Sequence, residues 1–189
     1  MGMLNARRSL IRSKCIMAAL MLFTSNGWAL TVIEKSFAEL VQQADLVVIG
    51  TVEYIDAQWE GVQTASRIVS AVTLGDLQVI KGAVTSSTYV LRIAGGSVGE
   101  VRQVYPGLPQ LALGGRYALF VRGNGQDLFP LVGVDQGVYE VNWDAPTRQY
   151  TARSLRYTAE HKAVNRAASL PLAELIDRIQ AHLPAPPTP

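Results

Sequence analysis

Residues 45–59 read DLVVIGTVEYIDAQW, and residues 65–82 read ASRIVSAVTLGDLQVIKG. Both stretches are rich in β-branched residues, and the second half of the first alternates between apolar and polar positions, which is typical of a strand with one buried face. A glycine inside such a run often marks a bulge or a sharp bend, so Gly75 predicts an interruption of the second strand. The sequence therefore predicts two long, bent strands.

Shorter extended runs follow these two strands and are separated by turn-forming residues. They are TYVLRIA (88–94), RYALFVRG (116–123), LFPLVGV (128–134), GVYEVNW (137–143) and RQYTARS (148–154). Long bent strands followed by closely spaced hairpins indicate a mainly β protein with an OB-like closed antiparallel barrel. An immunoglobulin-like β-sandwich is the alternative.

Helical patterns flank the predicted strands. In SFAELVQQA (36–44), Ser36 and Glu39 have the spacing of a capping box, which predicts a short N-terminal helix. In SLPLAELIDRIQAHL (169–183), Pro171 stands near a helix start and is followed by one apolar stripe. We therefore expect residues 158–183 to form a C-terminal helical segment packed on the barrel, and PAPPTP (184–189) to be a disordered tail.

The first 29 residues have the order of a signal peptide. Four basic residues precede the apolar run from Cys15 to Phe23, and small residues then lead to Ala29. The apolar run is too short to span a bilayer, so we expect no stable membrane anchor after cleavage. The mature protein would then be exported, to the periplasm or outside the cell, and would begin with a barrel domain over residues 30–157.

Removal of this segment reverses the charge. The whole chain has 17 basic and 15 acidic residues, and the four charged residues of the first 29 are all basic, which leaves 17 − 4 = 13 basic residues against 15 acidic ones. A chain without excess positive charge lacks the electrostatic signature of a nucleic-acid-binding protein. Cys15 lies in the removed segment, so the mature chain can form no disulfide and no Cys-ligated metal site.

The inventory of reactive side chains predicts no catalytic residue, no metal site and no cofactor. The two histidines, His161 and His182, lie outside the predicted barrel without a partner at ligand spacing, and we interpret both as solvated helix positions. Ser97 lies in GGSVG, which is not the GxSxG pattern of a nucleophile elbow. We therefore expect a protein that is not an enzyme.

The candidate binding site is the glycine-rich stretch AGGSVGEVRQVYPGLP (94–109). It contains no Lys and no helix follows it, so it does not fit a phosphate-binding loop. We expect an exposed loop whose glycines adopt unusual backbone angles, because recognition tends to lie on loops held by a rigid scaffold. The candidate partner-binding residues are Gly95, Gly96, Val98, Gly99, Tyr105, Pro106 and Pro109, together with Trp59 and Trp143 at strand ends.

The segments ADLVVIGTV, LQVIKG, LRIAGGSVGE, PGLP and GGRYALFVRG resemble, in this order, a group of secreted bacterial proteins. Their strand order is similar to that of the netrin-like, OB-type barrels of the tissue inhibitors of metalloproteinases, and the likeness covers residues 37–123. Those inhibitors chelate the zinc of the protease through an N-terminal Cys. A mature chain starting at Leu30 or Thr31 has no Cys, so the resemblance implies the barrel and a binding role and not that inhibitory chemistry.

The sequence therefore predicts an exported, non-catalytic module that binds a protein or a peptide, and the resemblance makes a secreted metalloprotease the first partner to consider. The alternative is a structural or glycan-binding module of the cell envelope. Exposed aromatic residues flanked by acids and amides would favour a glycan, whereas an apolar edge beside the glycine-rich stretch would favour a protein.

Overall fold

The computed structural model describes residues 33–61, 66–155 and 169–183, which all belong to one compact unit, Val32–Pro189. The predicted signal peptide, His161, the polar segment 158–168 and the tail 184–189 lie outside these residues. The described chain is mainly β and its strands pair in antiparallel fashion, which confirms the predicted class. Neither described helix is long and apolar enough to cross a membrane.

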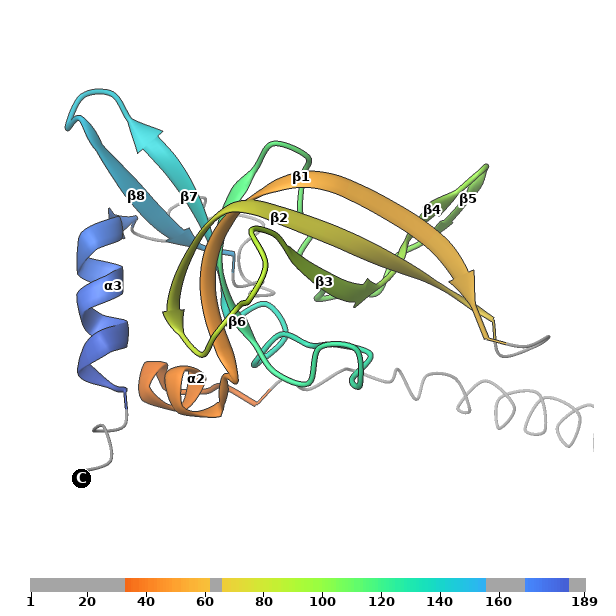
Figure 1. Cartoon of the computed structure of the whole chain (residues 1–189), viewed down its shortest axis with the longest axis horizontal. Helices are drawn as coiled ribbons and strands as arrows, with labels where there is room; N and C mark the ends of the chain where they lie inside the picture. Colours follow the sequence, from red (N-terminus) through yellow and green to blue (C-terminus); the bar gives the residue numbers. More distant parts are fainter. Residues whose placement is uncertain (1–32, 62–65, 156–168, 184–189) are drawn as a thin grey trace, which may run out of the picture. The chain divides into compact units, whose positions relative to one another are not determined.

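Seven strands form one sheet in the order β3-β2-β1-β6-β7-β8-β9, and a short hairpin, β4–β5, forms a second sheet (Figure 1). The strands are β1 (Leu46–Glu60), β2 (Arg67–Lys81), β3 (Tyr89–Ala94), β4 (Gly96–Val98), β5 (Val101–Gln103), β6 (Arg116–Val121), β7 (Val138–Asp144), β8 (Gln149–Ser154) and β9 (Leu170–Pro171). The helices are α2 (Phe37–Gln43) and α3 (Leu172–Ala181). The two long strands and both helices thus lie where the sequence predicts them.

The two long strands are bent, as Gly75 predicts. The register between β1 and β2 shifts near Thr51, the residue that pairs with Gly75, and the next residue, Asp76, has a φ of 49°. A Cβ at Gly75 would overlap the carboxylate of Glu53 on the neighbouring strand, so a larger residue there would have to displace this exposed side chain. In Figure 1, β1 and β2 arch together over the molecule as one curved ribbon.

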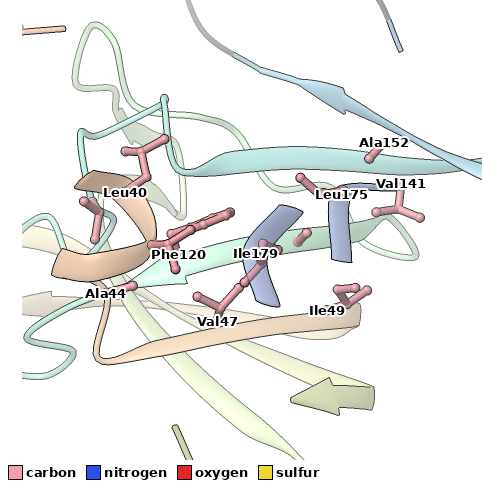
Figure 2. Close-up of a cluster of buried hydrophobic side chains, with 12 residues drawn as sticks. Leu40, Ala44, Val47, Ile49, Phe120, Val141, Ala152, Leu175 and Ile179 are labelled. Atoms are coloured by element: carbon pink, nitrogen blue, oxygen red, sulfur yellow. The ribbon is translucent and has the colours of Figure 1, made fainter. Parts of the chain in front are cut away.

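The curvature gives the sheet two buried faces. One face, which includes Val47 and Ile49 of β1, is covered by the two helices through Leu40, Leu175 and Ile179, as Figure 2 shows. The other face lies inside the curl of β3, β2, β1 and β6. Its buried side chains include Leu46, Val48, Val52, Val72, Leu74, Leu91, Ile93, Leu119 and Val121. Because alternate residues of LVVI (46–49) enter opposite cores, this run has no polar position.

No described sheet closes into a barrel, because β3 and β9 end the seven-stranded sheet without pairing with each other. The free edge of β3 instead meets the segment that follows β6. Arg92 N donates a hydrogen bond of 2.9 Å to Asn124 Oδ1, and Asn124 Nδ2 donates one of 2.7 Å to the carbonyl oxygen of Val90. Ala94 N donates a longer bond of 3.4 Å to the Leu128 carbonyl. Irregular chain therefore bridges β3 and β6.

The predicted strand over residues 128–134 is wrong. Leu131 forms only an isolated bridge with Val121, and the chain then turns through Gly133 and Val134, whose φ angles are 65° and 64°. Pro130 has no N–H to donate to a strand ladder, and positive φ angles are incompatible with extended chain. Leu131 and Val132 are still buried, so the apolar run reflects packing and not a strand.

Both ends of helix α2 form contacts that suit a helix terminus. Ser36 and Glu39 form the predicted capping box: Glu39 N donates to Ser36 Oγ over 3.3 Å, and Ser36 N donates to Glu39 Oε2 over 2.7 Å. The Ser36 hydroxyl also donates to this carboxylate, which lowers the pKa of Glu39. At the other end of α2, Lys81 Nζ donates to the Val41 carbonyl over 2.7 Å, which places a cation at the negative end of the helix.

Candidate functional site

The glycine-rich stretch is partly a hairpin where the sequence predicts an irregular loop. Strands β4 and β5 pair Ser97 with Arg102 and Val98 with Val101, so that Gly99 and Glu100 form a two-residue turn. Gly99 has a φ of 58°, as such tight hairpin turns require at their first central position. The two glycines before the hairpin also have positive φ angles, 101° at Gly95 and 132° at Gly96, which confirms that these glycines adopt unusual backbone angles.

Close packing explains why two glycines stand at the exit of β3. Gly95 N donates a hydrogen bond of 2.8 Å to the carbonyl of Ile68, and the buried Ser70 hydroxyl donates one of 2.7 Å to the Gly95 carbonyl. A Cβ at Gly96 would overlap Ser70 Oγ and lie 3.1 Å from the Cβ of Ala57. These glycines hold the hairpin against β1 and β2, which is a structural role.

A pocket of about 240 Å³ lies between this hairpin, the inner side of β1 to β3 and the segment 104–111. Apolar side chains line much of it: Ile55, Val72, Ile93, Val104, Leu108 and Leu111. Among the described residues that line the pocket, Arg102 alone carries a charge. Its Nη2 donates a hydrogen bond of 3.2 Å to Gln110 Oε1, which joins β5 to the segment opposite.

The two walls of the pocket are fixed to the rest of the fold. Gln103 Oε1 accepts a hydrogen bond of 2.6 Å from Ile68 N, which ties β5 to the start of β2. The Tyr105 ring packs edge-on against Phe129, with 5.6 Å between ring centroids. The pocket is therefore formed by contacts of the chain itself and needs no ligand to shape it.

The structure gathers four of the nine predicted site residues around this pocket and leaves five outside its lining. The four are Gly95, Gly96, Tyr105 and Pro109. Three others, Val98, Gly99 and Pro106, belong to the same stretch but do not line the pocket, and the two tryptophans lie on other strands. The prediction from sequence missed Arg102 and Gln110. An isolated Arg among glycines and prolines was the available signal, but its partner depends on how the segment 104–111 folds back.

The two described tryptophans lie near strand ends, as expected. Trp59 is half-exposed next to the end of β1. Trp143 of β7 is 55% exposed and pairs across the hairpin with Tyr150, with ring centroids 5.1 Å apart in a T-shaped arrangement. Asn142 and Asp144 flank Trp143 in sequence, but successive side chains of a strand point to opposite faces, so these amide and acid groups lie on the other face of the hairpin.

His182 fits the solvated position that the sequence predicts. It is exposed at the C-terminal end of α3, where its Nδ1 lies 2.8 Å from the Arg178 carbonyl oxygen and its ring packs edge-on against Phe37. Within the described part of the chain, no three side chains of His, Cys, Asp or Glu come together in a way that could hold a metal ion.

No family model, no curated protein and no solved structure matches this chain.

Proposed function

We propose that the protein is an exported, non-catalytic module that binds a segment of a protein or peptide in the pocket beside the β4–β5 hairpin. The observation that carries this proposal is a ready-made pocket with an apolar interior and one cation at its rim. In this proposal the curled part of the sheet acts as an OB-like barrel, in which residues 122–130 fill the gap between β3 and β6.

The size and rigidity of the pocket favour part of a larger partner. Pockets for drug-sized ligands usually measure about 300–1,000 Å³, so a volume of about 240 Å³ suits one or two side chains. Both walls are held by internal hydrogen bonds and ring contacts, so little conformational entropy would be lost on binding. Val104 lines the pocket and is 54% exposed, which gives a partner an apolar contact at the mouth.

A secreted metalloprotease is the first partner class to test, on the resemblance in sequence. Binding would be measured with an inactive, zinc-loaded secreted endopeptidase immobilised on a sensor surface. Capture of the wild-type chain that is lost in the variant Val104→Glu would support this partner class. No capture of the wild-type chain would remove it, and equal capture of both chains would exclude the pocket as the site of contact.

Selection of peptides from a random phage-displayed library tests the proposal. We expect the full chain to enrich peptides whose binding weakens at least tenfold on Val104→Glu, because the new carboxylate would have to be desolvated at the pocket. The matched control is Val101→Glu, since Val101 is 50% exposed on the same hairpin but does not line the pocket. Selected peptides that bind both variants as tightly as the wild type would contradict the proposal.

The exposed pair Trp143–Tyr150 supports a second candidate function, binding of a glycan. The two exposed rings present an apolar aromatic surface on which a sugar ring can stack, and the Tyr150 hydroxyl can form a hydrogen bond with it. The test is titration with cellohexaose and chitohexaose, followed by tryptophan fluorescence. Glycan binding predicts a change that disappears in Trp143→Phe and persists in Trp59→Phe, and a signal unchanged by the first substitution would exclude this hairpin.

A further inference from the structure

We propose that the pocket takes the free C-terminus of a peptide, with the last side chain in the apolar interior and the terminal carboxylate on Arg102. This inference rests on the proposed function, binding of a peptide in this pocket, and names the part of the peptide that is recognised.

The positive charge of Arg102 at the rim of the pocket favours an acidic group in the ligand. No carboxylate forms an ion pair with Arg102 within the described residues, and the side chain is exposed. A guanidinium has five N–H donors and no acceptor, and Gln110 takes one of these donors. The remaining donors match the two oxygens of a carboxylate, which Arg binds in bidentate fashion.

The interior of the pocket offers no charged partner for an acidic side chain, because Arg102 alone carries a charge among the described residues that line it. Ser70 Oγ donates its proton to the Gly95 carbonyl, so it has none left for a carboxylate. A carboxylate side chain pushed into this space would lose its hydration without a compensating charge. The interior therefore favours an apolar side chain, and the carboxylate has to stay at the rim.

A pocket that takes an apolar side chain inside and a carboxylate at its rim favours the C-terminal residue of a peptide over an internal Asp or Glu. In the last residue of a peptide, the apolar side chain and the carboxylate are attached to the same Cα, so one can enter the pocket while the other meets Arg102. An internal Asp or Glu can also bring its carboxylate to Arg102, but a neighbouring residue would then have to supply the apolar side chain. The small volume also limits the pocket to about one large side chain.

Two sets of octapeptides test the inference with the full chain. Both sets have a Gly-Ser body and each of the twenty residues in the last position, one set with a free carboxylate and one with a C-terminal amide. We expect free-acid peptides ending in Leu, Ile, Val or Phe to shift the amide resonances of Ser97, Arg102 and Gln110, and the amidated peptides to bind at least tenfold more weakly.

Variants of the rim give a second readout. Arg102→Gln should weaken binding of the free-acid peptides at least tenfold and leave the amidated peptides unaffected, and Arg102→Lys should restore part of the loss because it keeps the charge without the planar fork. The matched control is Arg92→Gln on β3, which removes an exposed Arg that does not line the pocket. Unchanged thermal unfolding of each variant shows that the fold is kept.

Several outcomes would overturn the inference and leave the proposed function standing. Equal binding of acid and amide, tighter binding of peptides with an internal Glu, or no shift with any free-acid peptide would each exclude recognition of a C-terminus. Octanoate that binds as tightly as the best peptide would assign the site to free carboxylic acids. If the peptides selected from the library bind Val104→Glu as tightly as they bind the wild type, the proposed function itself is contradicted.

Discussion

Replacement of Gly96 by Ala tests how the hairpin is held against the sheet. The added Cβ would overlap Ser70 Oγ and meet Ala57 at 3.1 Å, and the backbone φ of 132° lies in a region that side chains rarely adopt. Ser70 cannot turn away without giving up its buried hydrogen bond to the Gly95 carbonyl.

The expected cost follows from these two effects. A residue forced into a sparsely populated backbone region costs about 1–3 kcal/mol, and loss of one hydrogen bond adds about 1 kcal/mol. We therefore expect Gly96→Ala to lower the free energy of unfolding by about 2–4 kcal/mol, measured by urea denaturation followed by circular dichroism. Gly99→Ala is the matched control, because its Cβ would meet no atom within 4 Å, and it should cost only about 1–2 kcal/mol.

Addition of Ser70→Ala isolates the steric part of this cost. In that background the overlap at Oγ is gone, so Gly96→Ala should cost about 1 kcal/mol less than it does in the wild type. If Gly96→Ala proves no more destabilising than Gly99→Ala, the hairpin is not packed against β2 in the way described, and the pocket would lose one of its walls.

Three further substitutions probe the rest of the fold. Ile179→Ala should cost about 2–5 kcal/mol because the side chain is fully buried between α3 and the sheet, whereas Gln180→Ala should stay within about 0.5 kcal/mol, and equal effects in urea denaturation would contradict the packing of α3. Glu39→Gln should remove a pH dependence: hydrogen bonds from Ser36 lower the pKa of Glu39 below its ordinary 4.5, so its contribution to stability is present above that pH and is lost as the pH falls through the lowered pKa. If the free energies of unfolding of the wild type and of Glu39→Gln change with pH in the same way below pH 4.5, the Glu39 carboxylate contributes nothing to stability. Asn124→Ala should free the edge of β3, so amide hydrogen exchange at Arg92 should become at least tenfold faster, and unchanged exchange would contradict the bridge from β3 to the segment after β6.

Strands with strong local patterns could be predicted from the sequence. The β-branched runs of β1 and β2 and the capping box of α2 contain their structural signal within a few residues, and Gly75 marked the bend. The predicted strand over LFPLVGV (128–134) was wrong because a buried apolar residue in a turn gives the same sequence pattern as a buried apolar residue in a strand. The bridge between β3 and the segment after β6 depends on Asn124, which lies 32 residues from Arg92 in sequence, and no local sequence pattern predicts this contact.

In the candidate site, too, some features have a local signal in the sequence and others depend on tertiary contacts. The glycines marked a stretch with unusual backbone angles, because positive φ angles and close approach are properties of single positions. The pocket requires the segment 104–111 to fold back so that Gln110 meets Arg102, and this contact arises from tertiary structure. The sequence placed Trp59 and Trp143 correctly near strand ends, but neither of them lines the pocket.

Mapping of amide chemical shifts on the full chain with a selected peptide tests the central claim most directly. The proposed function predicts that the largest changes fall on Gly95 to Ser97 and on residues 102–111, which surround the pocket. Changes centred instead on the β7–β8 hairpin around Trp143 and Tyr150, with the pocket residues unaffected, would contradict the claim and move the binding site to the exposed aromatic pair.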